Sequence, residues 1–228
     1  MRPLHAAWAQ KAEEVETLLR FLFRAYEGRV ALSASFGGGG IVLAHMVSRI
    51  DARVPVLFLD TGFHFPETVA FKERFAQRYG VHVVDLSTAL DATSDALYRT
   101  DPDRCCRIRK VEPMQRALAD FDLWITALRR DQSETRRWVD VVEVHEVGGR
   151  SILKAMPLAH WTRRDVADYL AAHDVPSHPL LERGYTSIGC WPCTRPTVEG
   201  ESERAGRWSG TAKTECGLHG VRALRPRD

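Results

Sequence analysis

The sequence predicts an α/β fold in which a mostly parallel β-sheet is flanked by helices. Residues 54–59 and 123–128 form short, continuous apolar runs, which are typical of strands buried on both faces. Longer segments with helical spacing alternate with these runs, and such alternation indicates βαβ units. At 228 residues, 44% of them hydrophobic and 27% charged, the chain is long enough to bury one substantial core. We therefore expect a single domain that spans residues 1–228.

The N-terminal elements are expected to be helix, strand, glycine-rich turn and helix. Apolar residues recur at spacings of three and four within residues 6–26, which indicates an amphipathic helix. A short strand at 29–35 precedes Phe36 and four glycines at 37–40, and an apolar helical run follows at 41–50. Backbone N–H groups in such a turn, at the positive end of a helix, suit a phosphate group. The pattern matches neither a dinucleotide-binding nor a Walker fingerprint, so a turn without a ligand remains an alternative.

Three further strands are expected, with helices between them. The apolar strand at 54–59 leads into a helix at 66–79, whose first turn carries the favourable residues proline and glutamate. A strand at 81–86 is followed by a helix at 107–119 and by the apolar strand at 123–128. These alternating elements extend the predicted parallel sheet.

The C-terminal part of the chain changes character. Residues 139–147 and 151–156 indicate a strand pair, and Thr162 followed by an acidic residue three positions later predicts a capped helix to about residue 172. From residue 176 onward, proline, glycine, serine and charged residues dominate. We expect irregular structure there, with a mobile tail at 200–228.

Polar residues follow the ends of the predicted strands. Ligands of a parallel sheet bind beyond the carboxyl ends of its strands, so one pocket can gather side chains from several of them. The residues at such ends are Ser33 and Ser35, then Asp60, Thr61 and Gly62, and then Arg129 and Arg130.

Four of the five cysteines lie in two short motifs. Cys105 and Cys106 are adjacent, and Cys190 and Cys193 form a C-x-x-C motif. Four thiolates are the usual ligand set of a [4Fe-4S] cluster or of a closed zinc site. Adjacent side chains diverge, so they reach two irons of a cluster more easily than one zinc ion, which favours the cluster. Buried free thiols and a thioredoxin-type redox pair remain alternatives.

The fifth cysteine, Cys216, stands apart from the other four and lies close in sequence to Lys213 and His219. Cationic neighbours favour the nucleophilic thiolate form of a cysteine.

The N-terminus lacks the apolar core of a signal peptide, and no apolar run is long enough to span a membrane. We therefore expect a cytoplasmic protein without a membrane partner, whose reduced cysteines serve metal binding and catalysis.

The net charge of +2 conceals clusters of arginine at 104–110, 129–137 and 203–228. Such clusters suit a small anionic ligand. The pattern does not resemble a module that reads DNA or RNA, so we expect no nucleic-acid partner. The sequence leaves the oligomeric state open.

Several motifs together resemble the iron-sulfur type of assimilatory adenylyl-sulfate (APS) reductase, within the family that also contains phosphoadenylyl-sulfate (PAPS) reductases. They cover nearly the whole chain, and their order and spacing agree with the family. The motifs are Ser-Ala-Ser-Phe-Gly at 33–37, Leu-Asp-Thr-Gly at 59–62, Cys-Cys-Arg-Ile-Arg-Lys-Val-Glu-Pro at 105–113, Arg-Arg-Asp-Gln-Ser at 129–133, Gly-Tyr-Thr-Ser-Ile-Gly-Cys-Trp-Pro-Cys-Thr at 184–194, Arg-Ala-Gly-Arg-Trp at 204–208 and Lys-Thr-Glu-Cys-Gly-Leu-His at 213–219.

The resemblance implies an adenine nucleotide α-hydrolase-like fold and the reduction of APS to sulfite and AMP by thioredoxin or a glutaredoxin-like donor. It implies a [4Fe-4S] cluster on Cys105, Cys106, Cys190 and Cys193, and catalysis by Cys216 on the mobile tail at 200–228. The substrate-binding residues that it implies are Ser33, Ser35, Phe36, Gly37, Asp60, Thr61, Gly62, Lys110, Arg129, Arg130, Arg136, Arg204, Arg207 and His219. One departure is the glycine run 38–40, which leaves the nucleotide contacts of that loop in question.

Attack of the Cys216 thiolate on the sulfur of APS would give a cysteine S-sulfonate, from which the thiol donor releases sulfite. Three alternatives remain. A PAPS reductase would need further cations for the 3'-phosphate. An ATP pyrophosphatase or tRNA sulfurtransferase would share the fold, but the S-G-G-x-D-S loop of that class is absent. A zinc or iron-sulfur binding module would not need Cys216.

Overall fold

The computed structural model describes residues 6–88 and 96–219. These residues contain one six-stranded sheet with the strand order β3-β2-β1-β4-β6-β5. Neighbouring strands run parallel except for β5 and β6, which form an antiparallel pair at one edge. This confirms the predicted α/β fold with a mostly parallel sheet. The strands are β1 (Val30–Ser33), β2 (Val56–Asp60), β3 (Val83–Ser87), β4 (Leu123–Thr126), β5 (Val142–Val147) and β6 (Arg150–Ala155).

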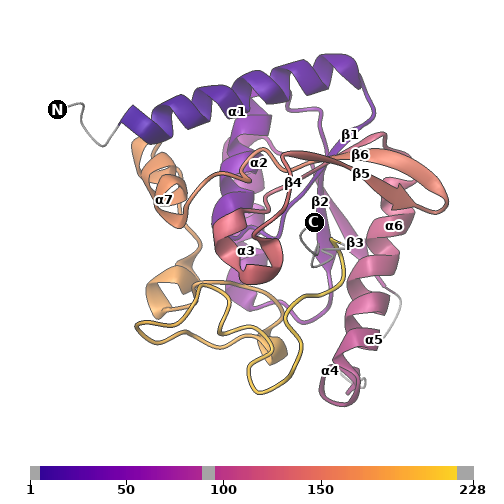
Figure 1. Cartoon of the computed structure of the whole chain (residues 1–228), viewed down its shortest axis with the longest axis vertical. Coiled ribbons are helices and arrows are strands. Elements are labelled where there is room, and N and C mark those ends of the chain that lie inside the picture. The colour runs from indigo at the N-terminus through magenta and orange to yellow at the C-terminus, as the bar shows by residue number, and fades with distance from the viewer. Residues whose placement is uncertain (1–5, 89–95, 220–228) are drawn as a thin grey trace, which may run out of the picture.

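Helices cover both faces of the sheet (Figure 1). One face carries α1 (Ala6–Ala25), α2 (Gly38–Ile50), α3 (Pro66–Tyr79) and α7 (Arg163–Ala172), whose apolar side chains join the main hydrophobic core. The opposite face carries α6 (Glu112–Leu118), which packs in a second core with residues of β1, β2, β4 and β6. Side chains on both faces of the central strands are therefore buried, which explains their continuous apolar sequences.

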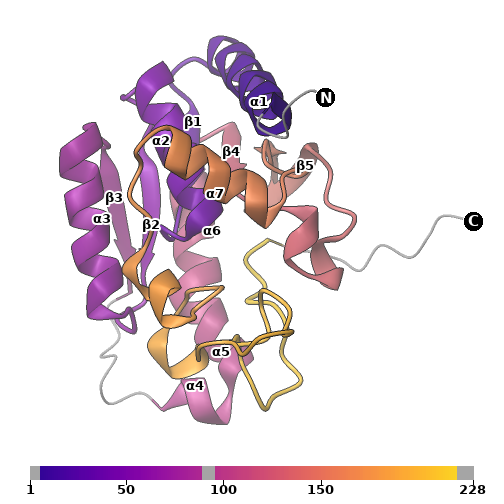
Figure 2. The ribbon, with the colours of Figure 1, turned by 90° about the vertical axis from the view of Figure 1, so that its left-hand side faces the viewer.

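A continuous helical segment on the α6 side carries the Cys-Cys pair. It consists of α5 (Pro102–Cys106), a π-helical turn (Arg107–Val111) and α6, and it follows the short α4 (Leu97–Thr100). Figure 2 shows α4 and α5 beyond the lower end of α6, beside the irregular C-terminal region. The sequence placed the start of this helix at residue 107, but it begins at Pro102, where the Asp101 carboxylate accepts a hydrogen bond from the backbone N–H of Arg104.

The glycine run also differs from the prediction. Gly38, Gly39 and Gly40 are not a loose turn but the first turn of α2. A Cβ atom added to Gly38 would lie 3.2 Å from Val166 Cγ1, and one added to Gly39 would lie 3.3 Å from the Cβ and carbonyl oxygen of Ala127. The helix therefore packs closely against its neighbours here, and the glycines permit this approach.

The remaining predictions of secondary structure are confirmed apart from small shifts of the boundaries. Thr162 and Asp165 form the expected capping box at the start of α7. Irregular structure with two short 3₁₀ turns, Pro179–Arg183 and Trp191–Cys193, follows α7. Within the described part of the chain, every helix is too short or too polar to cross a bilayer.

Candidate active site

A cavity of about 590 Å³ opens beyond the carboxyl ends of β1, β2 and β4. Its lining includes Ser33, Ser35 and Gly37 from the segment after β1, and Gly38–Gly40 from the first turn of α2. The N–H groups of this first helical turn have no partners within the helix, and Gly37 provides no side-chain cap. The cavity thus meets the positive end of α2, as expected for a site that binds an anion.

Not every residue expected at the strand ends reaches this cavity. Phe36 is fully buried and packs against Phe58 and Phe75 in the main core, so its backbone and not its ring lies beside the cavity lining. Asp60 accepts a hydrogen bond from the N–H of Gly62, and both residues belong to a turn outside the lining. Of the four residues Phe36, Asp60, Thr61 and Gly62, only Thr61 contributes to the cavity wall.

The four paired cysteines meet in a second, smaller pocket next to the main cavity. Cys105, Cys106, Cys190 and Cys193 all line it, together with residues that include Thr61, Lys110 and Trp208. Three of these cysteines are buried and Cys193 is partly buried. The two motifs, 84 residues apart at their nearest cysteines (190 − 106), therefore converge as the cluster interpretation requires.

The four thiols that line this pocket are the usual ligand set of a [4Fe-4S] cluster or of a closed zinc site. Burial raises the pKa of Cys105 and Cys193, and it raises the pKa of Cys106 to about 11. These three free thiols would remain protonated at neutral pH. Binding to several irons would favour their thiolate forms and relieve that burial cost.

The helix that carries Cys105 and Cys106 also supplies a cation that serves both pockets. Lys110 lies in the π-helical turn and lines the cysteine pocket and the main cavity. Burial alone lowers the pKa of Lys110, but its charge interactions with Cys190, Cys216 and Cys106 raise the pKa overall. The ammonium group therefore remains charged at the junction of the two pockets.

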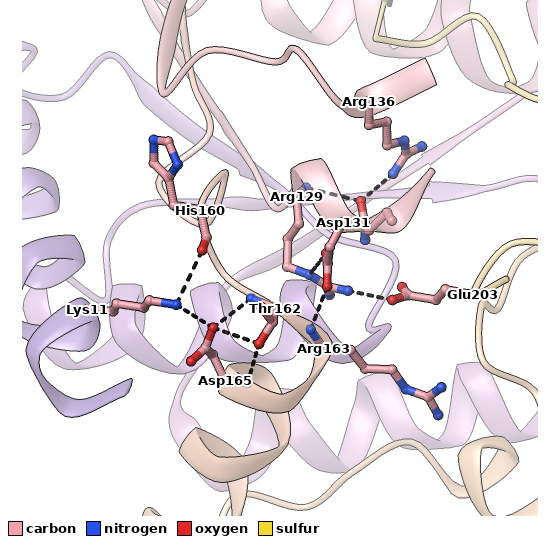
Figure 3. A network of polar contacts seen from close by, with 10 residues as sticks. Lys11, Arg129, Asp131, Arg136, His160, Thr162, Arg163, Asp165 and Glu203 are labelled. Atoms are coloured by element: carbon pink, nitrogen blue, oxygen red, sulfur yellow. Dashed lines mark hydrogen bonds and ion pairs between the residues drawn. The ribbon is translucent and has the colours of Figure 1, made fainter. Parts of the chain in front are cut away.

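The arginines of the cavity differ in whether a carboxylate already neutralises them. Arg129 is buried and donates to Asp131 at 2.9 Å and to Glu203 at 2.6 Å (Figure 3). Arg136 and Arg204 both donate to Glu215. In the described part of the chain, the side chains of Lys110, Arg163 and Arg207 line the cavity without a carboxylate partner. Arg130 lies outside the lining and donates to the carbonyl oxygen of Val139 at 2.8 Å.

Arg207 is held by aromatic and glycine contacts instead. Its guanidinium lies over the ring of Trp208, 4.6 Å from the centroid, and directly against the backbone of Gly189. Nη1 donates to the carbonyl oxygen of Ile188 at 3.3 Å. The backbone N–H of Trp208 donates to the carbonyl oxygen of Cys193 at 2.9 Å, so Arg207 and the C-x-x-C motif are positioned together.

The C-terminal segment places Cys216 in the wall of the main cavity. Lys213 forms an ion pair with Asp103 on α5, and Gly217 adopts a positive φ of 80° immediately after the cysteine. His219 stacks on Trp124 with ring centroids 5.4 Å apart, and its carbonyl oxygen accepts from Lys154 at 2.9 Å. Burial holds the pKa of His219 well below 6.5, so its imidazole is neutral.

Sequence reasoning missed several residues of this site. Glu203 and Glu215 neutralise arginines of the cavity, Gly189 makes room for Arg207, and Trp208 separates the two pockets as a lining residue of both. All of them lie in or beside the motifs at 184–194, 204–208 and 213–219. Their neighbours in those motifs could have drawn attention to them, but no local pattern indicates which arginine each glutamate contacts.

Comparison with known proteins shows the family of this chain. The family model described as "Phosphoadenosine phosphosulfate reductase domain" matches residues 29–196. The chain belongs to this reductase family. A relative named adenosine 5'-phosphosulfate reductase from Chelativorans sp. (strain BNC1) is 45% identical over 87% of this chain and 82% of its own length. A relative named phosphoadenosine 5'-phosphosulfate reductase from Gloeobacter violaceus is 40% identical over 90% of this chain and 88% of its own length.

Among solved structures, the family fold recurs in a phosphoadenylyl-sulfate (PAPS) reductase from Candida auris, which was crystallised as a phosphate complex. The two chains superpose with a TM-score of 0.67 and share 29% identity, over 78% of this chain and 89% of that chain. The adenine nucleotide α-hydrolase-like fold expected from the resemblance is confirmed. The family model ends at residue 196, so the segment with Cys216 lies beyond the matched residues.

Proposed function

We propose that this member of the reductase family converts APS to sulfite and AMP, in assimilatory sulfate reduction, with thioredoxin or a glutaredoxin-like protein as donor. The observation that carries the proposal is the position of Cys216. Its thiol lines the same cavity as Lys110, Arg163 and Arg207, three cations whose side chains form no ion pair with a carboxylate in the described part of the chain. A nucleophilic sulfur next to cations without anionic partners suits an anionic electrophile such as a phosphosulfate.

The first step follows from these positions. The Cys216 thiolate attacks the sulfur of APS, a bond forms between Sγ and that sulfur, and the bond to the bridging phosphate oxygen breaks. AMP leaves with the electron pair of the broken bond. Negative charge grows on the phosphate oxygens, where Lys110 and Arg207 offset it, and Cys216 becomes an S-sulfonate.

The second step needs a dithiol donor. One donor thiolate attacks Sγ of Cys216 and expels sulfite, and the second donor thiol then releases Cys216 and closes the donor's disulfide. The donor loses two electrons, which appear in sulfite. Access for a protein donor requires that the segment with Cys216 leave the cavity. We therefore propose a single domain with a mobile catalytic tail, expected from the sequence at 200–228, of which residues 220–228 lie outside the described part of the chain, in a reducing cytoplasm.

Cys105, Cys106, Cys190 and Cys193 would hold a [4Fe-4S] cluster in the smaller pocket. When bound, the cluster would supply a structural anchor and a charged centre beside the active site. Two residues of this chain lie at the boundary between the pockets. Thr61 Oγ1 lies 3.3 Å from Cys190 Sγ, and Lys110 lines both the cysteine pocket and the cavity. Each contact orients a group at the boundary between the pockets.

The choice of APS over PAPS rests on the supply of cations. A 3'-phosphate adds negative charge, yet three of the five cavity arginines, Arg129, Arg136 and Arg204, already contact carboxylates, which leaves Arg163, Arg207 and Lys110 for the substrate. The filled set of four cluster cysteines also accompanies APS in the family that the sequence resembles. The relative from Gloeobacter violaceus, which is named for PAPS, keeps PAPS as the alternative substrate.

The decisive experiment uses anaerobically purified enzyme and its Cys216→Ser variant. With APS and no donor, mass spectrometry should find one added SO₃ group on Cys216 of the wild type and none on the variant. Iron and acid-labile sulfide should be equal in the two proteins. Faster labelling by PAPS than by APS would favour the alternative, and an SO₃ group on another residue would overturn the mechanism.

A further inference from the structure

Glu215, immediately before the proposed nucleophile, sits in a complete carboxylate-binding site. Its Oε1 accepts hydrogen bonds from Thr135 Oγ1 at 2.9 Å and from Arg136 Nε at 2.8 Å. Its Oε2 accepts from Arg136 Nη2 at 2.8 Å and from Arg204 Nη2 at 3.0 Å. A carboxylate offers about four acceptor positions, so these four donors occupy all of them.

Thr135 and Arg136, which supply three of these four hydrogen bonds, are fixed by the body of the protein, whereas Arg204 belongs to the C-terminal region. The side chain of Arg136 is only 7% exposed, and its remaining nitrogen, Nη1, donates to Gln132 at 2.6 Å. Thr135 and Arg136 belong to the 3₁₀ turn Glu134–Arg136, which follows β4 and does not belong to the C-terminal segment. The part of the site formed by Thr135 and Arg136 therefore exists in the folded domain, and Glu215 is the group that the C-terminal segment inserts into it.

The electrostatics agree with a stable docked state. Burial raises the pKa of Glu215, but hydrogen bonds and charge interactions with Arg136 and Arg204 outweigh burial, and the pKa lies below its usual value. Glu215 is thus ionised at neutral pH, and its bonds to two arginines are charge-assisted, which makes them stronger than neutral hydrogen bonds.

We propose that Glu215 is the positioning residue of this enzyme: its carboxylate docks on Arg136, Arg204 and Thr135 and thereby holds the Cys216 thiol in the cavity. Because Glu215 and Cys216 are adjacent, docking of one restricts the position of the other to a few ångströms. Release of the same carboxylate frees the segment for the thiol donor. This inference rests on the proposed function only for its catalytic consequence, since the docking contact stands by itself.

The docked state also determines which cations of the cavity are available to bind the substrate. Arg136 and Arg204 contact Glu215 while Cys216 is in place, so the phosphosulfate must rely on Lys110, Arg163 and Arg207 during attack. Arg136 and Arg204 lose their carboxylate partner, and so can bind another anion, only when the segment leaves. The site thus alternates between binding its own carboxylate and exposing two arginines.

The first test measures the accessibility of Cys216 and does not require turnover. Cluster-loaded wild type and E215Q are treated with iodoacetamide, and the modified Cys216 peptide is followed by mass spectrometry. The neutral amide loses the charge-assisted bonds, so we expect E215Q to react about tenfold faster or more. The matched control is E201Q, because Glu201 contacts Arg195 twice in the same C-terminal region but outside the cavity. Its rate should equal that of the wild type.

The second test separates positioning from general damage. In single turnovers with APS, E215Q should form the S-sulfonate about tenfold more slowly, while the APS concentration for half-maximal rate changes less than about threefold. E215D, with the charge retained on a shorter side chain, should recover part of the rate. A purely structural defect would also change cluster content and the unfolding temperature, which should remain those of the wild type.

Two outcomes overturn the proposal: an alkylation rate in E215Q equal to that of the wild type, or unchanged S-sulfonate formation. If E215Q does not fold, T135V removes one donor from Glu215 and should raise the alkylation rate about threefold. If the wild type forms no S-sulfonate from APS or PAPS, the proposed function fails. The alkylation contrast still decides whether Glu215 docks the segment.

Discussion

At the scale of single residues, Gly189 determines where Arg207 can lie. The guanidinium rests against the Gly189 backbone, and an added Cβ atom would overlap it. We expect Gly189→Ala to displace Arg207 from the cavity without unfolding the protein, since the far end of a long side chain can move. KM for APS should rise about tenfold, and the unfolding temperature should remain near that of the wild type.

A double-mutant comparison is the control for this prediction. If Gly189→Ala acts by moving Arg207, then Arg207→Ala alone and the Gly189→Ala/Arg207→Ala double variant should show similar KM values. Additive losses in the double variant would mean that Gly189 has a separate role, for example in the conformation of the C-x-x-C segment. Iron content, measured in parallel, would reveal that role directly.

The functional residues divide by the kind of information that identifies them. Chemical type and spacing were sufficient to select Cys216 and the four paired cysteines, whereas the family resemblance was needed to select Lys110 and Arg207. The structure places all of them at the two adjacent pockets. Contacts between distant residues could not be predicted from spacing. Arg136 and Glu215 are 79 residues apart, and only the fold reveals that one neutralises the other. The sequence therefore overestimated the number of arginines available to a substrate.

At the scale of elements, packing at the start of α2 outweighs the preference of the local sequence for a turn. Three successive glycines favour a turn over a helix, because glycine is a poor helix former. The close contacts of Gly38 with Val166 and of Gly39 with Ala127 are properties of the assembled layers and are not visible in the local sequence. Strands such as β2 were easier to predict, because a strand that is buried on both faces has a continuous apolar sequence.

The packing of α2 predicts opposite effects for two neighbouring substitutions. Gly39→Ala would press a methyl group against the Cβ and carbonyl oxygen of Ala127 at 3.3 Å, so we expect a loss of about 1–2 kcal/mol in the free energy of unfolding. Gly40→Ala would meet Ala34 at 3.5 Å, an ordinary contact, and should gain about 0.5 kcal/mol from helix propensity. Chemical denaturation of both variants measures the difference. Equal effects would show that backbone freedom, and not contact with Ala127, decides the role of these glycines.

The helical segment from Pro102 to Leu118 connects both pockets to the sheet. Its π-helical turn sets the direction of Lys110 relative to Cys105 and Cys106, while Met114 and Leu118 anchor α6 in the second core. π-turns within helices occur frequently at functional sites. Rigid packing of one end thus fixes the cation and the two thiols at the other end.

At the scale of the whole molecule, the sheet order brings the site together. Residues after β1, β2 and β4, three adjacent parallel strands, line one side of the cavity, and the segment after α7 closes the other. The last described residues of the irregular C-terminal region, 213–219, are attached to the rest of the domain by the ion pairs of Glu215 with Arg136 and of Lys213 with Asp103, and by stacking of His219 on Trp124. Such a region can separate from the cavity while the sheet and its helices remain folded.

The buried histidines predict how the stability of the molecule depends on pH. Burial lowers the pKa of His45 and of His178 to about 4, from an ordinary value of 6.5. Below pH 6.5 the unfolded chain takes up these protons while the folded chain does not. Stability is therefore lost as pH falls from 6.5 towards 4, by up to about 1.4 kcal/mol per pH unit for each histidine, and the loss levels off below pH 4.

His178→Asn tests this prediction at one site. His178 is fully buried, accepts the N–H of Leu180 at Nδ1 and lies 3.0 Å from Thr68 Oγ1 through Nε2. Asparagine can still accept from Leu180 but does not titrate, so the variant should start about 2 kcal/mol less stable at pH 7 and lose less stability on acidification. Urea denaturation at pH 7, 6 and 5 should show a slope reduced by about 1.4 kcal/mol per pH unit, whereas His82→Asn, at an exposed histidine, should retain the wild-type slope. A slope unchanged in His178→Asn would mean that this imidazole is protonated equally in the folded and unfolded chains, against the burial that the fold imposes on it.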